Sequence, residues 1–254
     1  MDASATPSWA DSWQASWDRL EDDLVPDREQ RIGVLLDLVE GIAGTAPTVV
    51  DLACGTATVT RRLLDRLPGA RSIAVDVDPV LLTIAAATFA DDARVRIVRA
   101  DLRDPSWAEA VAAGPQVDAV VTSTALHWLP EDAVSRLYRD LGGLVRPGGV
   151  VAHSEQMPLA ELPRLGAALA EVDHRRRIGA ADRRRWDAWW AGAASDPALE
   201  AATAQRRAVF ETTYPVEEFT PPADWHVAAL TEAGFTEAGV VWRSGTAAVV
   251  AAIR

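Results

Sequence analysis

The chain has 254 residues, of which 49% are hydrophobic and 24% charged, and its formal net charge is −12. This length and hydrophobic content suffice for a substantial core, as one domain or as a domain with a cap. The negative charge argues against a nucleic-acid backbone or an anionic membrane as the main partner. All 25 basic residues are arginine, which excludes chemistry that needs lysine, and the one cysteine excludes an internal disulfide and a cysteine-rich zinc site.

No targeting or membrane-spanning signal is present in the sequence. Residues 1–16 lack the basic-then-apolar order of a signal peptide, and no uncharged apolar run is long enough to span a bilayer. We therefore expect a cytoplasmic protein, a monomer or homodimer, whose partner is a small-molecule substrate.

The first predicted element is an amphipathic helix over residues 8–24. Trp9, Trp13, Trp17 and Leu20 recur at helical spacing and share one face. That face either packs against the rest of the protein or forms a flap over a bound ligand, with Trp17 as a substrate-contacting residue.

A second helix is expected after Pro26, with Asp27 as its N-cap. Gly44 and Pro47 end it. Its apolar stripe comprises Ile32, Leu35, Leu36, Val39 and Ile42.

From residue 48 onward, short apolar strands alternate with helices. The predicted strands are 48–53, 71–76, 94–99, 117–122, 149–154, 238–243 and 246–253, and the predicted helices are 58–67, 79–89, 106–113, 131–143 and 222–233. This rhythm is typical of an α/β fold, Rossmann-like and doubly wound. We predict a mostly parallel seven-stranded sheet with one antiparallel strand, because the last two strands are close enough to form a hairpin.

The alternation breaks between about 156 and 222, where the pattern predicts helices near 159–174, 180–194 and 196–207 and an extended piece over 208–214. Two triple-arginine runs, Arg175–Arg177 and Arg183–Arg185, are expected to face solvent. The predicted organisation therefore has three parts. They are N-terminal helices over 1–46 that act as a lid, a sheet domain over 47–155 and 223–254, and an inserted helical cap over 156–222.

Polar or acidic side chains follow four consecutive strands. Asp51, Asp76, Asp101 and Thr122 each stand at or just beyond a strand end. Ligands bind at the carboxyl edge of open α/β sheets, so these positions predict one binding site. The dinucleotide fingerprint G-x-G-x-x-G is absent, which disfavours a nicotinamide dehydrogenase.

Six stretches match a known family: VVDLACGTATVT, IAVDVDP, RADLRD, VDAVVTSTALHWLP, LGGLVRPGGVVAH and EAGF. Through them the chain resembles the class I S-adenosylmethionine-dependent methyltransferases, over about 48–154 and 230–254. Within that family it is most similar to the small-molecule branch that includes trans-aconitate-type methyltransferases. The resemblance implies S-adenosylmethionine as the cofactor.

The resemblance also implies roles for individual residues. Near the amino-acid part of the cofactor it places Asp51, Ala53, Cys54, Gly55 and Thr56. It places Asp76 on the ribose, Val77 and Leu102 at the adenine ring, Asp101 at the adenine amino group and Thr122 near the methionine moiety.

The chain departs from the family pattern at positions 53 and 57, which are commonly glycine and are alanine here. Ala53 is a tolerated variant. Ala57 adds a methyl group where the loop approaches the ligand, and a right-handed backbone at that position would accept it.

A base is needed only if the acceptor carries a proton. His127 follows the fourth strand and is the first candidate; His153 and Glu155 are second candidates, and His153 and Trp128 are candidates for contact with substrate. His174 and His226 are expected at the surface or in the cap.

Two arginines before the first strand, Arg28 and Arg31, could hold a carboxylate of the cofactor or of an acidic substrate. The alternative is that they lie on a solvated helix face. The four histidines show no ligand spacing, so we expect no metal.

The predicted activity is methyl transfer to an oxygen or nitrogen of a small molecule. The alternative is a protein of the same fold that catalyses a cyclisation or rearrangement, or that acts as a binding partner.

Overall fold

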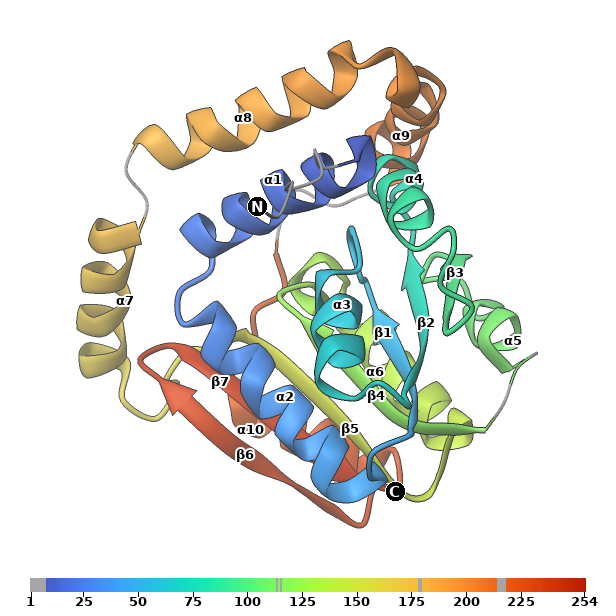
Figure 1. Ribbon diagram of the computed structural model, residues 1–254. Coiled ribbons are helices and arrows are strands. Elements are labelled where there is room, and N and C mark those ends of the chain that lie inside the picture. Colours follow the sequence, from blue (N-terminus) through green and yellow to red (C-terminus); the bar gives the residue numbers. More distant parts are fainter. Residues whose placement is uncertain (1–7, 113, 115, 178–179, 214–217) are drawn as a thin grey trace, which may run out of the picture.

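The computed structural model describes residues 8–112, 114, 116–177, 180–213 and 218–254; within these, it describes only the backbone of 173–177, 180–183 and 211–213. Its centre is a seven-stranded sheet with the order β3-β2-β1-β4-β5-β7-β6 (Figure 1). Only β7 runs antiparallel to its neighbours, β5 and β6. The predicted fold class is thereby confirmed. The strands are β1 Thr48–Leu52, β2 Arg71–Asp76, β3 Val95–Arg99, β4 Val117–Ser123, β5 Val145–Gln156, β6 Glu237–Ser244 and β7 Ala247–Ile253.

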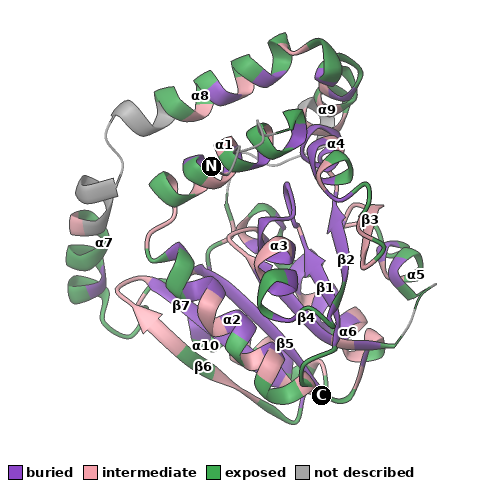
Figure 2. Cartoon of the chain, viewed as in Figure 1, coloured by how far each residue is buried: buried purple, intermediate pink, exposed green. Residues whose placement is uncertain are grey.

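Helices cover both faces of this sheet. One apolar core lies between the sheet and α2 (Arg28–Ala43), α3 (Thr58–Arg66) and α4 (Pro79–Thr88). The other lies between the sheet and α5 (Trp107–Ala112), α6 (Glu131–Leu144) and α10 (Ala223–Glu232). The central strands are therefore buried on both faces, which explains their unbroken apolar runs, and Figure 2 shows them as the most buried part of the chain.

A third apolar cluster joins the N-terminal helix to α4 and to the segment inserted between β5 and α10. Helix α1 (Trp9–Leu24) packs on α4 and on α8 (Ala180–Ser195), and α9 (Glu200–Thr213) also packs on α4. The ring of Trp17 lies 4.8 Å from that of Trp189, which in turn donates its indole N–H to Ser16. Trp17 is thus buried against the cap, Trp13 is half-buried and Trp9 stays exposed. Helix α7 (Pro163–Arg177) stands apart from this bundle (Figure 1).

Asp27 is the N-cap residue of α2, as predicted, but its backbone is left-handed and its side chain makes no capping hydrogen bond. Several other local predictions are wrong. Ile42, expected in the buried stripe of α2, is 42% exposed. Residues 208–213 continue α9 as a helix instead of extending, and β5 starts at Val145, four residues before the expected strand. No helix in the described parts of the chain is long and apolar enough to cross a membrane.

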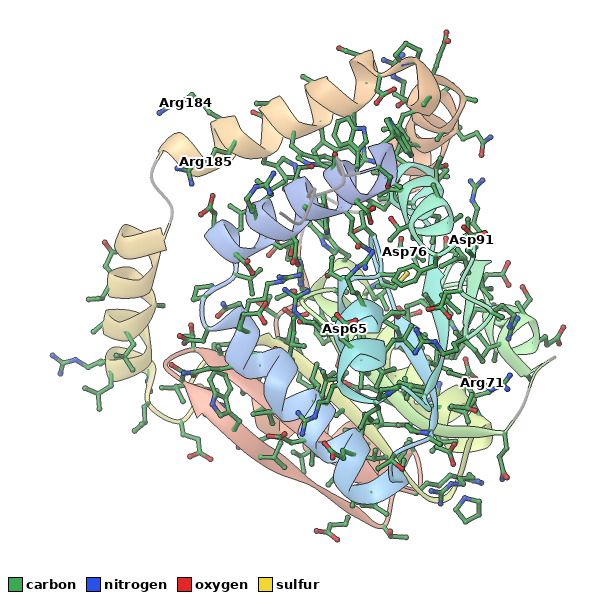
Figure 3. The ribbon with its side chains drawn as sticks, in the orientation of Figure 1. Asp65, Arg71, Asp76, Asp91, Arg184 and Arg185 are labelled. Carbon is green, nitrogen blue, oxygen red and sulfur yellow. The ribbon has the colours of Figure 1, made fainter. Side chains whose placement is uncertain are left out.

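The first arginine run ends α7 and the second lies in α8. Arg184 and Arg185 are exposed, as expected, and lie at the outer end of α8 in Figure 3. Arg185 pairs with Asp23 of α1 at 2.7 Å. The side chains of Arg175–Arg177, Arg183 and His174 fall outside the described residues.

Candidate active site

A cavity of about 370 Å³ opens at the carboxyl ends of β1, β2 and β4, beneath α1, α8 and α9. Its volume falls in the range of small-molecule sites. Of the residues predicted from the sequence, those that line it are Arg28, Asp51, Ala53, Cys54, Gly55, Asp76, Val77, Leu102, Trp17 and Trp128.

The turn between β1 and α3 forms one wall. Its backbone is left-handed at Ala53 (φ 52°), Gly55 (φ 57°) and Ala57 (φ 62°). The right-handed conformation considered for Ala57 is therefore wrong, and two alanines adopt a conformation that favours glycine. The turn holds because the Cys54 N–H donates to Val75 O and the Ala57 N–H donates to Cys54 O.

Asp76 fixes this turn to the end of β2. Its carboxylate accepts hydrogen bonds from the backbone N–H groups of Gly55, Val77 and Asp78, at 2.7–2.8 Å. Burial raises the pKa of Asp76 to about 6 although these bonds oppose the shift. Asp76 lies within the body of the fold (Figure 3) and is one of the residues that line the cavity.

Asp51 stands at the end of β1, beside Asp76. One oxygen accepts from both the N–H and the hydroxyl of Thr60. Burial raises the pKa of Asp51 to about 7, and the Asp76 charge adds to the shift. The two adjacent carboxylates make this wall suitable for a group that donates hydrogen bonds or carries positive charge.

Gly55 leaves room for a ligand at the turn. A Cβ built at this position would lie 3.4 Å from Nε1 of Trp17, so a side chain there would occupy the space between the turn and α1. The small residues, the two carboxylates and the apolar wall of Val77, Ala100 and Leu102 together fit an adenosine-bearing cofactor.

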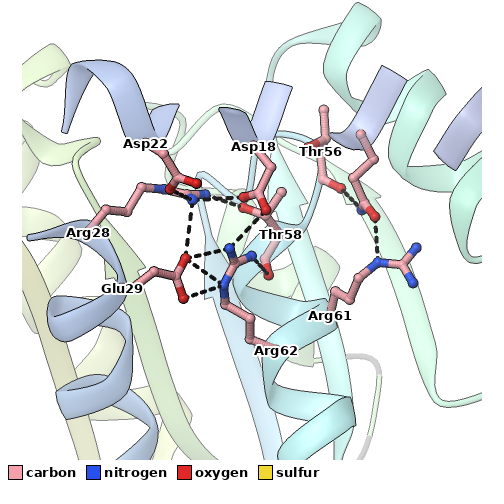
Figure 4. A network of polar contacts seen from close by, with 9 residues as sticks. Asp18, Asp22, Arg28, Glu29, Thr56, Thr58, Arg61 and Arg62 are labelled. Carbon is pink, nitrogen blue, oxygen red and sulfur yellow. Dashed lines mark hydrogen bonds and ion pairs between the residues drawn. The ribbon is translucent and has the colours of Figure 1, made fainter. Parts of the chain in front are cut away.

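Arg28 joins α2 to the cavity, and Figure 4 shows its contacts. Its guanidinium pairs with Asp18 and Asp22 at 2.7 Å and donates to the Thr58 hydroxyl at 2.8 Å. Arg62 of α3 also binds Asp18, at 2.8 Å. Arg28 is buried, so the solvated-face alternative is wrong for this residue.

Arg206 of α9 lines the cavity and was not foreseen from the sequence. It pairs with Asp78 at 2.6 Å, and its guanidinium carbon lies 3.7 Å from the ring centre of Trp190 and 4.4 Å from that of Phe210. The only sequence feature that could have indicated Arg206 is its spacing of four residues from Phe210, which places the two side chains on one face of a helix. This contact connects the cap to the first turn of α4.

Three predicted cofactor residues do not line the cavity. Asp101 pairs with Arg103, and although burial opposes the shift, this pairing lowers the pKa of Asp101. Thr56 and Thr122 are buried behind the wall. In place of Asp101 and Thr122, the next residues along the chain, Leu102 and Ser123, line the cavity.

His127 lies behind the cavity wall rather than in it. Its Nδ1 is 3.1 Å from Oε2 of Glu155, and this carboxylate raises the pKa of His127 against the opposing effect of burial. His127 is thus paired with Glu155 and is not among the residues that line the cavity, so its position does not support the predicted role as a base.

The predicted substrate contact of His153 is not seen. This residue is buried between β5, α6 and α10, where its ring faces that of His226 at 4.5 Å and both histidines contact the Tyr138 hydroxyl. His226 is 1% exposed, so its expected surface position is wrong. Burial lowers the pKa of His153 well below its usual value and that of His226 to about 4, so both are neutral core residues.

Comparisons with known proteins agree with this geometry. Residues 49–149 match a family model described as a methyltransferase domain. The chain is 38% identical over 113 residues to the trans-aconitate 2-methyltransferase of Azoarcus sp. (strain BH72), a match that covers 44% of this chain and 40% of that protein. It is 31% identical over 134 residues to the malonyl-(acyl-carrier protein) O-methyltransferase of Paenibacillus sp. (strain JDR-2), covering 51% and 46%.

These matches span less than half the length of the two relatives. Among solved structures, the DhpI–SAM–HEP complex superposes with a TM-score of 0.57 at 17% identity, over 98% of this chain and 100% of that one, which shows a shared fold. Residues 49–149 thus carry a methyltransferase domain, and the chain is similar in sequence and in fold to S-adenosylmethionine-dependent methyltransferases.

Proposed function

We propose that this protein transfers the methyl group of S-adenosylmethionine to an oxygen or nitrogen of a small molecule, without a metal ion. The observation that carries the proposal is the pair of buried carboxylates, Asp51 and Asp76, on either side of the open turn at Gly55. The cavity continues from this pair to an aromatic roof, so one space can hold a cofactor and an acceptor together. The name of the Paenibacillus relative, an O-methyltransferase, supports oxygen as one acceptor atom.

The residues at the strand ends would hold the cofactor. Asp76 is the candidate partner of the ribose hydroxyls, and Val77 and Leu102 flank the adenine. Asp51 and the backbone at Ala53–Gly55 would hold the amino-acid end. A bound sulfonium supplies an electrophilic methyl group without further activation, so the protein has to align the acceptor and exclude water. Trp17, from the predicted lid, and the cap residues above it close the cavity for that purpose.

Calorimetry with S-adenosylmethionine and with its demethylated product tests this proposal. We expect binding by the wild-type protein and a loss of about tenfold or more for Asp76→Ala, because a charge-assisted contact to a hydroxyl pair contributes about 1.5–3 kcal/mol. Asp76 also orders the Gly55 turn, so circular dichroism and the variant Asp76→Asn, which keeps one acceptor oxygen for that turn, separate folding from binding. Absence of binding to wild-type protein would refute the proposal.

A non-methylating reaction on the same fold is the second candidate. The left-handed alanines at 53 and 57 favour it, because they add methyl groups to a turn that glycine usually forms. Mass spectrometry of the acceptor distinguishes the two candidates: gain of a methyl group supports transfer, and a rearranged acceptor of unchanged mass supports the alternative. Turnover that persists in a chelator would support metal independence.

A further inference from the structure

Glu21 is the acidic side chain on the roof of the cavity. It lies on α1 one turn after Trp17, and both residues line the cavity. Among the described residues its carboxylate has no hydrogen-bond or ion-pair partner. The charged groups that face it are Arg28, Asp18 and Asp22 from α1 and α2, and His127 from the segment after β4.

The positive charges of the cavity are already neutralised. Arg28 is held by Asp18 and Asp22, and Arg206 is held by Asp78. An acceptor with a carboxylate or phosphate would have to displace one of these pairs. It would also approach the unpaired Glu21 carboxylate, and like charges repel.

Aromatic side chains gather on one part of the cavity surface. Trp17, Trp128, Trp186, Trp190 and Phe210 line it from α1, the β4–α6 segment, α8 and α9. Flat rings bury large apolar areas and stack on other rings. This roof therefore favours a flat aromatic molecule.

We propose that the acceptor is an aromatic molecule without a carboxylate or phosphate, whose O–H or N–H group donates a hydrogen bond to Glu21. This inference rests on the proposed methyl transfer. In that reaction the acceptor oxygen or nitrogen forms a bond to the methyl carbon, the carbon–sulfur bond breaks with its electron pair staying on sulfur, and the acceptor proton moves to Glu21. Burial raises the pKa of the Glu21 carboxyl, which makes it a better proton acceptor than an exposed glutamate.

His127 acts through Glu21 in this arrangement. Glu155 favours the charged form of His127, and that positive charge stabilises the ionised form of Glu21. His127 is then a positioning residue, in place of the base expected from the sequence.

Binding of two matched naphthalenes tests the inference. The probes are 2-naphthol and 2-naphthoate, titrated calorimetrically into protein saturated with S-adenosylhomocysteine. We expect 2-naphthol to bind wild-type protein about tenfold or more tightly than 2-naphthoate, because hydrogen bonds to charged groups contribute about 1.5–3 kcal/mol. In Glu21→Gln the preference should fall at least about fivefold, since the variant keeps an acceptor oxygen and removes the charge.

Asp23→Asn is the matched control. Asp23 lies two residues further along α1, is exposed, and pairs with Arg185 outside the cavity. The variant makes the same change in net charge and should keep the wild-type preference.

Equal or tighter binding of 2-naphthoate would overturn the inference, as would binding of neither probe or an unchanged preference in Glu21→Gln. The preceding titration with S-adenosylhomocysteine alone tests the proposed function separately. Cofactor binding without the naphthol preference would refute only the substrate class.

Discussion

At the scale of single residues, the turn after β1 combines two opposing effects. Ala57 is fully buried in the apolar core between the sheet and α3, where its methyl group contributes packing. The turn also holds Ala57 in a left-handed backbone conformation, where its methyl group costs about 1–2 kcal/mol relative to a right-handed conformation.

We predict that Ala57→Gly changes the free energy of unfolding by less than about 0.5 kcal/mol, because relief of the backbone strain offsets the lost methyl packing. The matched control is Ala85→Gly in α4, which is equally buried but right-handed within a helix. It should lose roughly 1.5–2 kcal/mol from helix propensity and packing. Urea unfolding measures both, and equal losses would show that the turn at Ala57 is unstrained.

Residues also show where prediction from the sequence ends. Asp51, Gly55 and Asp76 could be predicted because strand ends in an alternating fold meet at one edge. Glu21 and Arg206 could not, because the faces that α1 and α9 present to the cavity depend on how the cap packs. Asp101 was predicted to face a ligand, but a neighbouring arginine two residues away satisfies it locally.

At the scale of elements, α9 is attached to the sheet domain through one side chain in particular. Arg206 combines an ion pair to α4 with stacking on Trp190 and Phe210. The sequence predicted the helices of this segment but displaced their ends, because their apolar spacing is weak and tertiary contacts determine where they stop.

Arg206→Leu should loosen the cap selectively. Losing a partly exposed ion pair and the stacking of the guanidinium costs about 1–2 kcal/mol, which corresponds to roughly tenfold faster hydrogen exchange in α8 and α9. Exchange in β1, β4 and β5 should stay unchanged. Arg207→Leu, at the next and exposed position, is the control. Equal acceleration by both variants, or acceleration throughout the sheet, would contradict the role given to Arg206.

At the scale of the whole molecule, the site contributes to how stability depends on pH. The pKa of Asp51 is about 7 in the folded state and that of an unfolded aspartate is about 3.9. At a pH between these two pKa values, Asp51 is protonated in the folded state and ionised in the unfolded state, so the folded state binds one more proton. The free energy of unfolding therefore falls as the pH rises through this window.

Asp51→Asn removes this dependence and keeps an acceptor for Thr60. The quantity to compare is the free energy of unfolding of the variant minus that of wild type. We predict that this difference is about 2 kcal/mol larger at pH 8 than at pH 5. Urea unfolding at both pH values measures the difference, and Asp65→Asn, an exposed residue of α3, should show none. A relative stability independent of pH would mean that Asp51 titrates as an ordinary aspartate.

The strand directions followed from the chain rhythm, because a strand–helix–strand unit joins parallel strands and a short hairpin joins antiparallel ones. The packing of α1 against α8 in the third apolar cluster could not be predicted. The two helices lie about 160 residues apart, and nothing local in the sequence of either one indicates the other.

The tryptophan contact between α1 and α8 has a consequence for biosynthesis. Helix α1 leaves the ribosome long before α8, so its tryptophans can pack on α4 but not on Trp186, Trp189 and Trp190 until the segment through Phe210 has been made. During that interval the strand-end residues at Asp51 and Asp76 lack the part of the roof that α8 and α9 supply. A nascent chain can therefore form most of the sheet before it can enclose a ligand, and cofactor retention on stalled chains should begin abruptly once α9 has left the exit tunnel.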